Sequence, residues 1–124
     1  MKALVVDDSL TIRRIVIKAL AGIGINEAAE AGDGQEAVSA AGQGQFDLIL
    51  MDWNMPKMTG IDALRAIRQS GNKTPVVMVT TEAEKSRVIE AIKTGANDYL
   101  IKPFSPEQLA AKVKHILGAA APAH

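Results

Sequence analysis

The sequence predicts an α/β domain of five consecutive β–α units, with one parallel sheet doubly wound between helices on both faces. Three observations predict this class. Strand-like and helix-like segments alternate along the whole chain, as they do in parallel sheets joined by right-handed crossovers. Most strand candidates are continuous apolar runs, which is typical of strands covered on both faces. Glycines and helix-capping residues fall between the segments, where the chain has to turn.

The expected strands are 2–7, 25–30, 46–51, 75–80 and 98–102. All but the second are nearly continuous apolar runs, so they suit positions with both faces buried. The segment 25–30 is weak and polar, so it suits an edge of the sheet.

The expected helices lie between and after these strands, and each carries apolar residues at helical spacing on one side. The first covers 10–22, where glycines end it. Two pairs have the spacing of a capping box before the second and fourth helices: Asp33 with Glu36, and Thr81 with Glu84. Gly60 precedes the third helix, and Ser105 with Pro106 begins the fifth.

Composition limits the classes of function. With 124 residues, 48% of them apolar, the chain suits one domain, expected over 1–118 with a flexible tail at 119–124. A net charge of zero argues against a nucleic-acid partner, and the absence of cysteine excludes a disulfide scaffold. No apolar stretch suits a membrane span, and Asp7 and Asp8 leave the first run too short for a signal peptide. We therefore expect a soluble, cytoplasmic protein with no membrane partner.

Polar residues stand where four of the apolar runs end: Asp7 and Asp8, Asp52, Thr80, and Lys102. Because ligands bind beyond the carboxyl ends of strands in open α/β sheets, we expect these side chains to converge there. Each alone has a commonplace interpretation as a helix cap, a turn or a solvated lysine. Four unrelated turns would rarely supply this charge set at one edge, so their joint occurrence favours a site.

The converging groups suit a divalent cation and a phosphoryl group. Mg2+ prefers oxygen ligands, and three carboxylates with one lysine give a formal charge of −2 that one such ion would neutralise. Lys102 suits a phosphate oxygen, and Thr80 can donate a hydroxyl hydrogen bond. Asp52 stands alone while Asp7 and Asp8 form a natural cation pair. We therefore choose Asp52 as the nucleophile that becomes an acyl phosphate.

These residues, in this order and spacing, resemble the receiver domain of two-component response regulators over nearly the whole chain. The matching positions are Val5-Val6-Asp7-Asp8, Asp52 with Met55-Pro56 and Gly60, Thr80, Gly95-Ala96, and Lys102-Pro103-Phe104. The segment from Asp52 to Pro56, together with Tyr99, looks most like the CheY-like chemotaxis branch. The resemblance implies a flavodoxin-like sheet with strand order 2-1-3-4-5.

The resemblance also implies a role for each residue of the site. Asp52 would accept a phosphoryl group from a phosphohistidine of a sensor kinase. The ligands of Mg2+, or alternatively Mn2+, would be Asp7, Asp8, Asp52 and the backbone carbonyl of Asn54. Lys102 would pair with the phosphate, and its peptide bond to Pro103 would be cis.

Thr80 and Tyr99 are the implied switch. Thr80 would move toward the phosphate, and Tyr99 would turn into the vacated space and reshape the face of the fourth helix, fifth strand and fifth helix. The residues expected on this output face are Lys85, Val88, Ile92, Ala96, Tyr99, Ile101 and Lys112.

Three positions are expected to tune the lifetime of the phosphoryl group. Asn54 and Glu82 would flank the approach of water, and neither is bulky or basic, so we expect a short lifetime. Thr81 stands where a smaller residue is common, and its bulk would slow exchange. The protein would be no enzyme for a separate substrate, but it would catalyse its own phosphorylation and dephosphorylation.

The expected partners are a chemotaxis-type sensor histidine kinase, a separate output protein such as the flagellar motor switch, and a phosphatase. A monomer is expected, with a phosphorylation-dependent dimer as the alternative. A stand-alone receiver in another phosphorelay, in stress or in cell-cycle signalling is the first competing interpretation.

Three further interpretations fit the residues less well. An aspartyl-phosphate phosphatase would carry a second acid where Asn54 stands. A flavin binder would place Asp7 and Asp8 against a cofactor phosphate that they repel. A receiver-like module without phosphorylation would not need every functional position intact. Elsewhere, Trp53 is expected to be a partly exposed packing residue that reports metal binding, and Arg13 and Arg14 are expected to be solvated.

Overall fold

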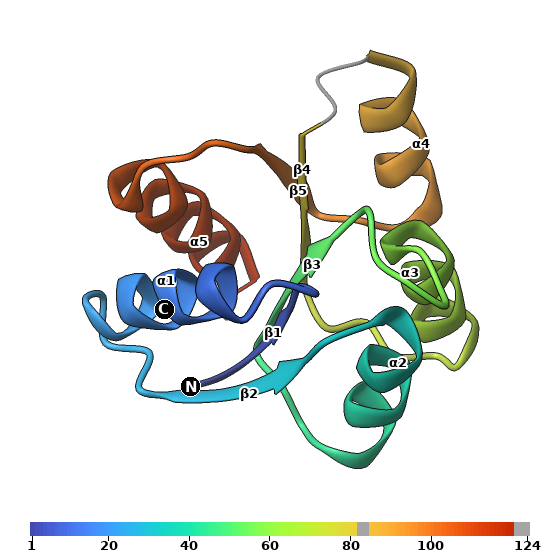
Figure 1. Ribbon diagram of the computed structural model, residues 1–124, viewed down its shortest axis with the longest axis horizontal. Helices are drawn as coiled ribbons and strands as arrows, with labels where there is room; N and C mark the ends of the chain where they lie inside the picture. Colours follow the sequence, from blue (N-terminus) through green and yellow to red (C-terminus); the bar gives the residue numbers. More distant parts are fainter. Residues whose placement is uncertain (82–84, 121–124) are drawn as a thin grey trace.

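The computed structural model describes residues 1–81 and 85–120, and the side chains of these except residues 85, 119 and 120. Its strands are β1 (Lys2–Val6), β2 (Glu27–Ala31), β3 (Leu48–Asp52), β4 (Val76–Thr80) and β5 (Asp98–Ile101). Its helices are α1 (Leu10–Ala21), α2 (Gly34–Gln43), α3 (Gly60–Gln69), α4 (Lys85–Thr94) and α5 (Pro106–Ala120). All strand pairs are parallel and the order is β2-β1-β3-β4-β5, which confirms the predicted fold class and strand order (Figure 1).

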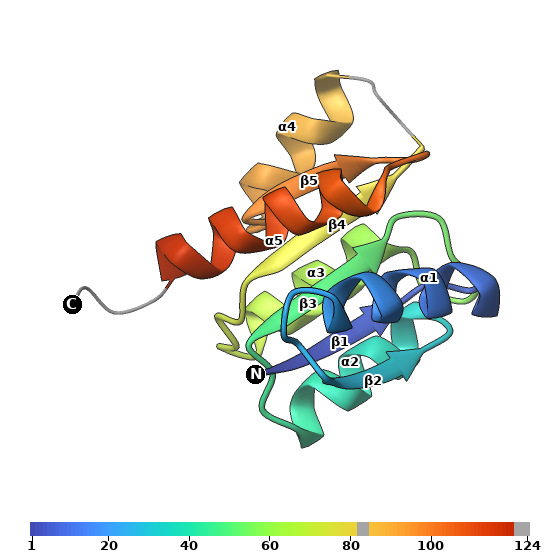
Figure 2. The ribbon, with the colours of Figure 1, turned by 90° about the vertical axis from the view of Figure 1, so that its left-hand side faces the viewer.

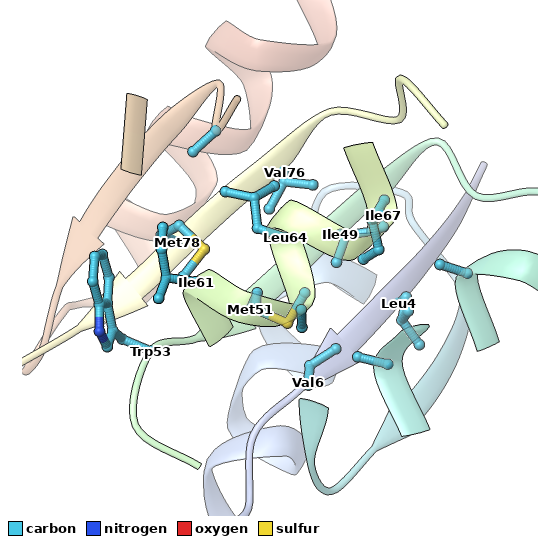
Figure 3. Packing of buried hydrophobic residues seen from close by; sticks show 14 of the residues in the cluster. Leu4, Val6, Ile49, Met51, Trp53, Ile61, Leu64, Ile67, Val76 and Met78 are labelled. Carbon is cyan, nitrogen blue, oxygen red and sulfur yellow. The ribbon is translucent and has the colours of Figure 1, made fainter. Parts of the chain in front are cut away.

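The sheet is the middle layer of three. Helices α1 and α5 cover one face, and α2, α3 and α4 cover the other (Figures 1 and 2). Successive residues of a strand point to opposite faces of the sheet, so each central strand contributes side chains to two hydrophobic cores. The core between the sheet and α2–α4 includes Leu4, Ile49, Leu64, Val76 and Met78 (Figure 3). The core between the sheet and the α1–α5 layer includes Val5, Leu20, Leu50, Val77 and Val113. Burial on both faces explains why β1, β3 and β4 lack an alternating pattern.

The weak second strand lies at an edge of the sheet, as predicted, but it covers Glu27–Ala31 rather than 25–30. The reason lies in Ile25. Its N–H donates to the carbonyl of Leu20 at 3.0 Å, and its side chain is buried against α1 and α5. Ile25 therefore completes the end of α1, and pairing with β1 begins two residues later.

Helices α2 and α3 begin at capping residues of the predicted kind, but one hydrogen bond at the start of α2 differs from the predicted capping box. Asp33 caps α2 by accepting from Glu36 N–H at 2.9 Å, but the Glu36 carboxylate accepts from Gly32 N–H at 2.6 Å rather than from Asp33. Thr59 caps α3 by accepting from Asp62 N–H. Glu84, of the pair predicted to cap the fourth helix, lies outside the described residues.

Arg68 holds the end of the sheet opposite the carboxyl ends of the strands. Its guanidinium donates to the carbonyls of Gly95 and Asn72 at 3.0 and 2.9 Å and to Asn97 Oδ1 at 3.1 Å. Asn97 Oδ1 also accepts from Val76 N–H, so the network joins α3 to the starts of β4 and β5. Burial lowers the pKa of Arg68, and these acceptors compensate for lost solvation.

We expect Arg68→Ala to lower the free energy of unfolding by about 2 kcal/mol, because the carbonyls of Gly95 and Asn72 lose a guanidinium donor in a partly buried site. Urea denaturation measures the change. Arg65→Ala is the control on the same helix, since Arg65 forms an exposed ion pair with Asp62 and its loss should matter by about 0.5 kcal/mol or less. Equal losses in the two variants would contradict the assignment of Arg68 as a structural clamp.

Within the described residues, no helix is long and apolar enough to cross a membrane. Helix α5 continues through Ala120, so it includes the first two residues of the segment expected as a tail. Residues 121–124 lie outside the described part of the chain.

Candidate functional site

Three carboxylates meet at the carboxyl edge of the sheet. Asp7 follows β1, Asp52 is the last residue of β3, and these two strands are neighbours. Each of Asp7, Asp8 and Asp52 offers an oxygen, and these oxygens lie within 4.8 Å of one another. Asp7 and Asp52 are buried, with 3% and 5% exposure, while Asp8 is exposed. The cluster therefore opens to solvent on the side of Asp8.

Lys102 reaches into this cluster from the end of β5. Its Nζ lies 2.9 Å from Asp7 Oδ2 and 3.2 Å from Asp52 Oδ1, so one ammonium bridges two buried carboxylates. Lys102 N–H also donates to the Thr80 carbonyl at 2.8 Å, which fixes the lysine backbone beside β4. Residues separated by as many as 95 positions in the chain thus form one charged group.

The local chain holds Asp7 in place. Its Oδ1 accepts from Ser9 N–H at 2.9 Å, while the Ser9 hydroxyl caps α1 by accepting from Ile12 N–H. Its own N–H donates to the Ala31 carbonyl at 3.1 Å. Asp7 is therefore held in a fixed position just before α1.

Electrostatics distinguish Asp52 from its neighbours. Burial, and then the negative charge of Asp7, raise the pKa of Asp52 to about 6, although Lys102 opposes the rise. Burial alone would lower the pKa of Lys102, but its hydrogen bond to Asp7 and the charges of Asp52 and Asp7 raise it overall. The site therefore holds an excess of negative charge that one lysine does not balance.

The donor set fits a divalent cation. Three carboxylates and one ammonium carry a formal charge of −2, and hard oxygen ligands are those that Mg2+ and Mn2+ prefer. Asn54, whose backbone carbonyl is the predicted fourth ligand, is exposed two residues beyond Asp52. Its participation stays a prediction.

We expect Lys102→Met to raise the pKa of Asp52 further in the metal-free protein, because it removes a cation whose charge and hydrogen bond favour the ionised carboxylate. A 13C NMR titration of the Asp52 carboxyl carbon measures the change. Lys112→Met is the control, since Lys112 pairs with Asp98 on the α5 side of β5. An unchanged or lower Asp52 pKa in Lys102→Met would refute this description of the site.

The remaining site residues lie around this edge. Thr80 is buried at the end of β4, and Thr81 is exposed just beyond it. The Lys102–Pro103 peptide bond, which the resemblance implies to be cis, is cis in the structure. Glu82 lies outside the described residues. The structure thus brings the acids and Lys102 together, while the roles of Thr80 and Thr81 stay predictions.

The predicted output face follows the outer edge of the sheet. Tyr99 is half-buried on β5, and Lys112 lies over its ring at 4.8 Å while pairing with Asp98 at 2.9 Å. A groove of about 680 Å3 runs between β5 and α5 beside them. Ile92 on α4 is 47% exposed, whereas Ala96, between α4 and β5, is buried and offers almost no surface to a partner. The side chain of Lys85 lies outside the described part.

Two residues differ from their predicted environments. Trp53 is buried rather than partly exposed, packed with Ile61 and Met78, and Arg87 lies 5.3 Å from its ring (Figure 3). Arg13 is not solvated, because its side chain is only 16% exposed and contacts Asp7 and Glu30. Helical periodicity could not find Arg13, since its partners lie on other elements.

Comparisons with known proteins agree with this geometry. Residues 3–114 match the family described as the response regulator receiver domain. The chain is 46% identical over 118 residues to the chemotaxis protein CheY of Pseudomonas aeruginosa, covering 94% of this chain and 95% of that protein. It is 44% identical to the chemotaxis protein CheY-3 of Vibrio cholerae, covering 94% and 91%.

Solved structures show the same likeness. The Francisella response regulator 1452 receiver domain superposes with a TM-score of 0.90 at 32% identity, covering 97% of this chain and 98% of that one. The chemotaxis response regulator CheY4 of Vibrio cholerae gives a TM-score of 0.87 at 39% identity, covering 93% and 97%.

Proposed function

The chain belongs to the response regulator receiver domain family, and from that premise we propose that Asp52 accepts a phosphoryl group from a phosphohistidine of a sensor kinase in an Mg2+-dependent reaction. The observation that carries the proposal is the meeting of Asp7, Asp8, Asp52 and Lys102 at one edge of the sheet. A buried carboxylate beside two other acids and one lysine is suited to hold a cation and receive a phosphoryl group.

The transfer forms one bond and breaks another. A carboxylate oxygen of Asp52 attacks phosphorus in line, the nitrogen–phosphorus bond of the phosphohistidine breaks, and the imidazole leaves with the electron pair and takes up a proton. A bound Mg2+ ion supplies the positive charge that offsets the acids and the phosphoryl oxygens. With a pKa of about 6, Asp52 is mostly ionised at neutral pH and ready to attack.

Lys102 changes partners in this proposal. In the structure its Nζ is shared between Asp7 and Asp52. Once Asp52 carries the phosphoryl group, Lys102 pairs with a phosphate oxygen, which the phosphorus atom separates from the Asp52 oxygen. Water that reaches the acyl phosphate ends the signal, and the exposed Asn54 lies where it can influence that approach. Self-catalysed phosphorylation and a short lifetime follow from these features.

The output would pass through Thr80 and Tyr99 to the face of α4, β5 and α5. Thr80, at the end of β4, would turn toward the phosphate, and Tyr99 on the neighbouring strand would move inward. The half-buried state of Tyr99 and the exposed Ile92 support a face that a partner can cover. A complete switch needs about 5.5 kcal/mol of differential stabilisation, which a few charge-assisted hydrogen bonds can supply.

The relatives named as chemotaxis proteins support a role in chemotaxis, with a cytoplasmic chemotaxis kinase as phosphodonor and the flagellar motor switch as target. The measurement is binding of the phosphorylated protein to a flagellar switch protein by calorimetry. Phosphorylation without any binding to that protein would favour another phosphorelay.

The central test uses Mg2+ with acetyl phosphate, and separately with beryllofluoride, on wild type and Asp52→Asn. Wild type should gain the mass of one phosphoryl group with acetyl phosphate and change its Trp53 fluorescence with either reagent, since Trp53 directly follows Asp52 and is buried. Asp52→Asn should do neither. Asp62→Asn, an exposed carboxylate on α3, is the control and should behave as wild type.

Two outcomes would contradict the proposal. Phosphoryl transfer that survives in Asp52→Asn would place the acceptor elsewhere. Continuous hydrolysis of an added phosphoester by wild type would indicate an aspartyl-phosphate phosphatase instead.

A further inference from the structure

We propose that Arg13 is a positioning residue for the cation site, acting through the peptide that joins Asp7 to Asp8; the inference rests on the proposed function. Arg13 lies on the second turn of α1, and its Nη1 donates to the Asp7 carbonyl oxygen at 2.5 Å. That oxygen belongs to the peptide plane between the two tandem acids. Its orientation therefore sets where both carboxylates point.

The hydrogen bond from Arg13 adds a second restraint on the backbone of Asp7. The peptide plane before Asp7 is held by its N–H, which donates to the Ala31 carbonyl. The plane after Asp7 is held by Arg13. Because a peptide plane is rigid, these two hydrogen bonds together restrict both soft backbone dihedrals of Asp7. Removing Arg13 frees the second plane and, with it, the backbone of Asp8.

Arg13 is itself held in place. Its Nε donates to Glu30 Oε1 at 2.9 Å, and its Nη1 lies against Gly32, where an added Cβ would stand 3.7 Å away. The Arg13 side chain is 16% exposed and that of Glu30 is 42% exposed. A half-exposed ion pair of this kind contributes little stability by itself. The contact with the Asp7 carbonyl is therefore the main consequence of burying this guanidinium.

The direction of the change in Mg2+ affinity distinguishes a positioning role for Arg13 from a simple effect of its charge. Arg13 is a cation near a site that takes a cation, so by Coulomb repulsion alone its removal would tighten Mg2+ binding. If Arg13 positions the acids, its removal weakens binding. Groups that orient metal ligands from the outer shell typically change affinity by about 10- to 100-fold when they are lost.

The experiment titrates Mg2+ into the protein and follows Trp53 fluorescence, with Arg14→Ala as the matched control. Arg14 is the adjacent, exposed arginine, so its loss removes the same charge without this contact. We expect about tenfold weaker Mg2+ affinity for Arg13→Ala and less than a twofold change for Arg14→Ala. Arg13→Lys should fall between them, because one ammonium cannot reproduce the spread donors of a guanidinium.

A second set of variants tests whether Glu30 affects Mg2+ binding by holding Arg13 in place. Glu30→Gln should weaken Mg2+ binding by a smaller factor, about threefold, because it loosens the hold on Arg13. The double variant Arg13→Ala/Glu30→Gln should bind no more weakly than Arg13→Ala alone, since Glu30 acts through Arg13. If the losses of Mg2+ affinity in the two single variants multiply in the double variant, Glu30 does not act through Arg13.

A readout without metal completes the test. The 13C shift of the Asp7 carbonyl in the metal-free protein should move in Arg13→Ala and stay in Arg14→Ala, because Arg13 donates to that oxygen and the exposed Arg14 does not. Affinity in Arg13→Ala that equals or exceeds that of Arg14→Ala would overturn the positioning role and leave the proposed function intact. Absence of Mg2+ binding in wild type would overturn both.

Discussion

Asp52→Asn is expected to raise the free energy of unfolding of the metal-free protein by about 2 kcal/mol at pH 8 and by almost nothing at pH 4. In wild type the pKa of Asp52 is about 6, against an ordinary value of 3.8, because of burial and then the charge of Asp7. This difference corresponds to about 3 kcal/mol of unfavourable free energy once the group is ionised. The weakened hydrogen bond with Lys102 offsets part of the gain.

The sign of the pH dependence follows from proton linkage. The folded state binds the Asp52 proton more tightly than the unfolded state does. Wild type therefore loses stability as the pH rises from about 4 to about 6, and the penalty is complete above that window. Asparagine does not ionise, so the variant lacks this penalty. The measurement is urea denaturation of both proteins between pH 4 and pH 8, with a chelator present.

In the presence of Mg2+, wild type should become more stable than Asp52→Asn, the reverse of the metal-free order. Binding to the folded state alone stabilises wild type, whereas Asp52→Asn has lost one ligand and should respond less. Asp62→Asn is the control and should follow wild type under all conditions. A metal-free stability difference between wild type and Asp52→Asn that is the same at pH 4 and pH 8 would show that Asp52 titrates normally and that the site is not strained by charge.

Gly60→Ala is the second large effect, an expected loss of about 3 kcal/mol. A Cβ on Gly60 would overlap the backbone carbonyl oxygen of Asp52 and lie 3.0 Å from Met78 Cε. Gly60 N–H also donates to the Trp53 carbonyl at 2.8 Å, so α3 begins directly against the end of β3. The added methyl group must push these two backbones apart, and the movement displaces Asp52, the proposed acceptor.

Two measurements separate this effect from a general loss of stability. Urea denaturation gives the free energy, and a Trp53 fluorescence titration should show weaker Mg2+ binding because Asp52 has shifted. Gly42→Ala is the matched control: it lies inside α2 with open space around the added Cβ, so it should stabilise the protein by about 0.5–1 kcal/mol. A destabilised Gly60→Ala protein that still bound Mg2+ normally would show that the end of β3 accommodates the methyl group without moving Asp52.

The site could be predicted as far as local patterns reach. Asp7, Asp52 and Lys102 were found because each stands where an apolar run stops, and the carboxyl ends of parallel strands share one edge. The same argument could not order the strands. That order came from the resemblance, and the pairing of β1 with both β2 and β3 confirms it.

The predictions from sequence were wrong where a residue's environment depends on distant parts of the chain. Trp53 follows the proposed acceptor, Asp52, in a turn, which suggested exposure, but α3 and β4 enclose it. Arg13 sits beside the exposed Arg14 on the same helix, and the position of β2, which carries Glu30, makes Arg13 partly buried. In the same way, no local pattern shows that Arg68 meets Gly95 and Asn97.

The sequence by itself determined the alternation of strands and helices, the buried runs and the chemical kinds of group at the strand ends, because these depend on the period and composition of short segments. Only the tertiary structure decided which arginine is buried, how Lys102 is shared between two acids, and how closely α3 approaches Asp52. Those features depend on distances between elements far apart in the chain, which are set when the helices pack on the sheet.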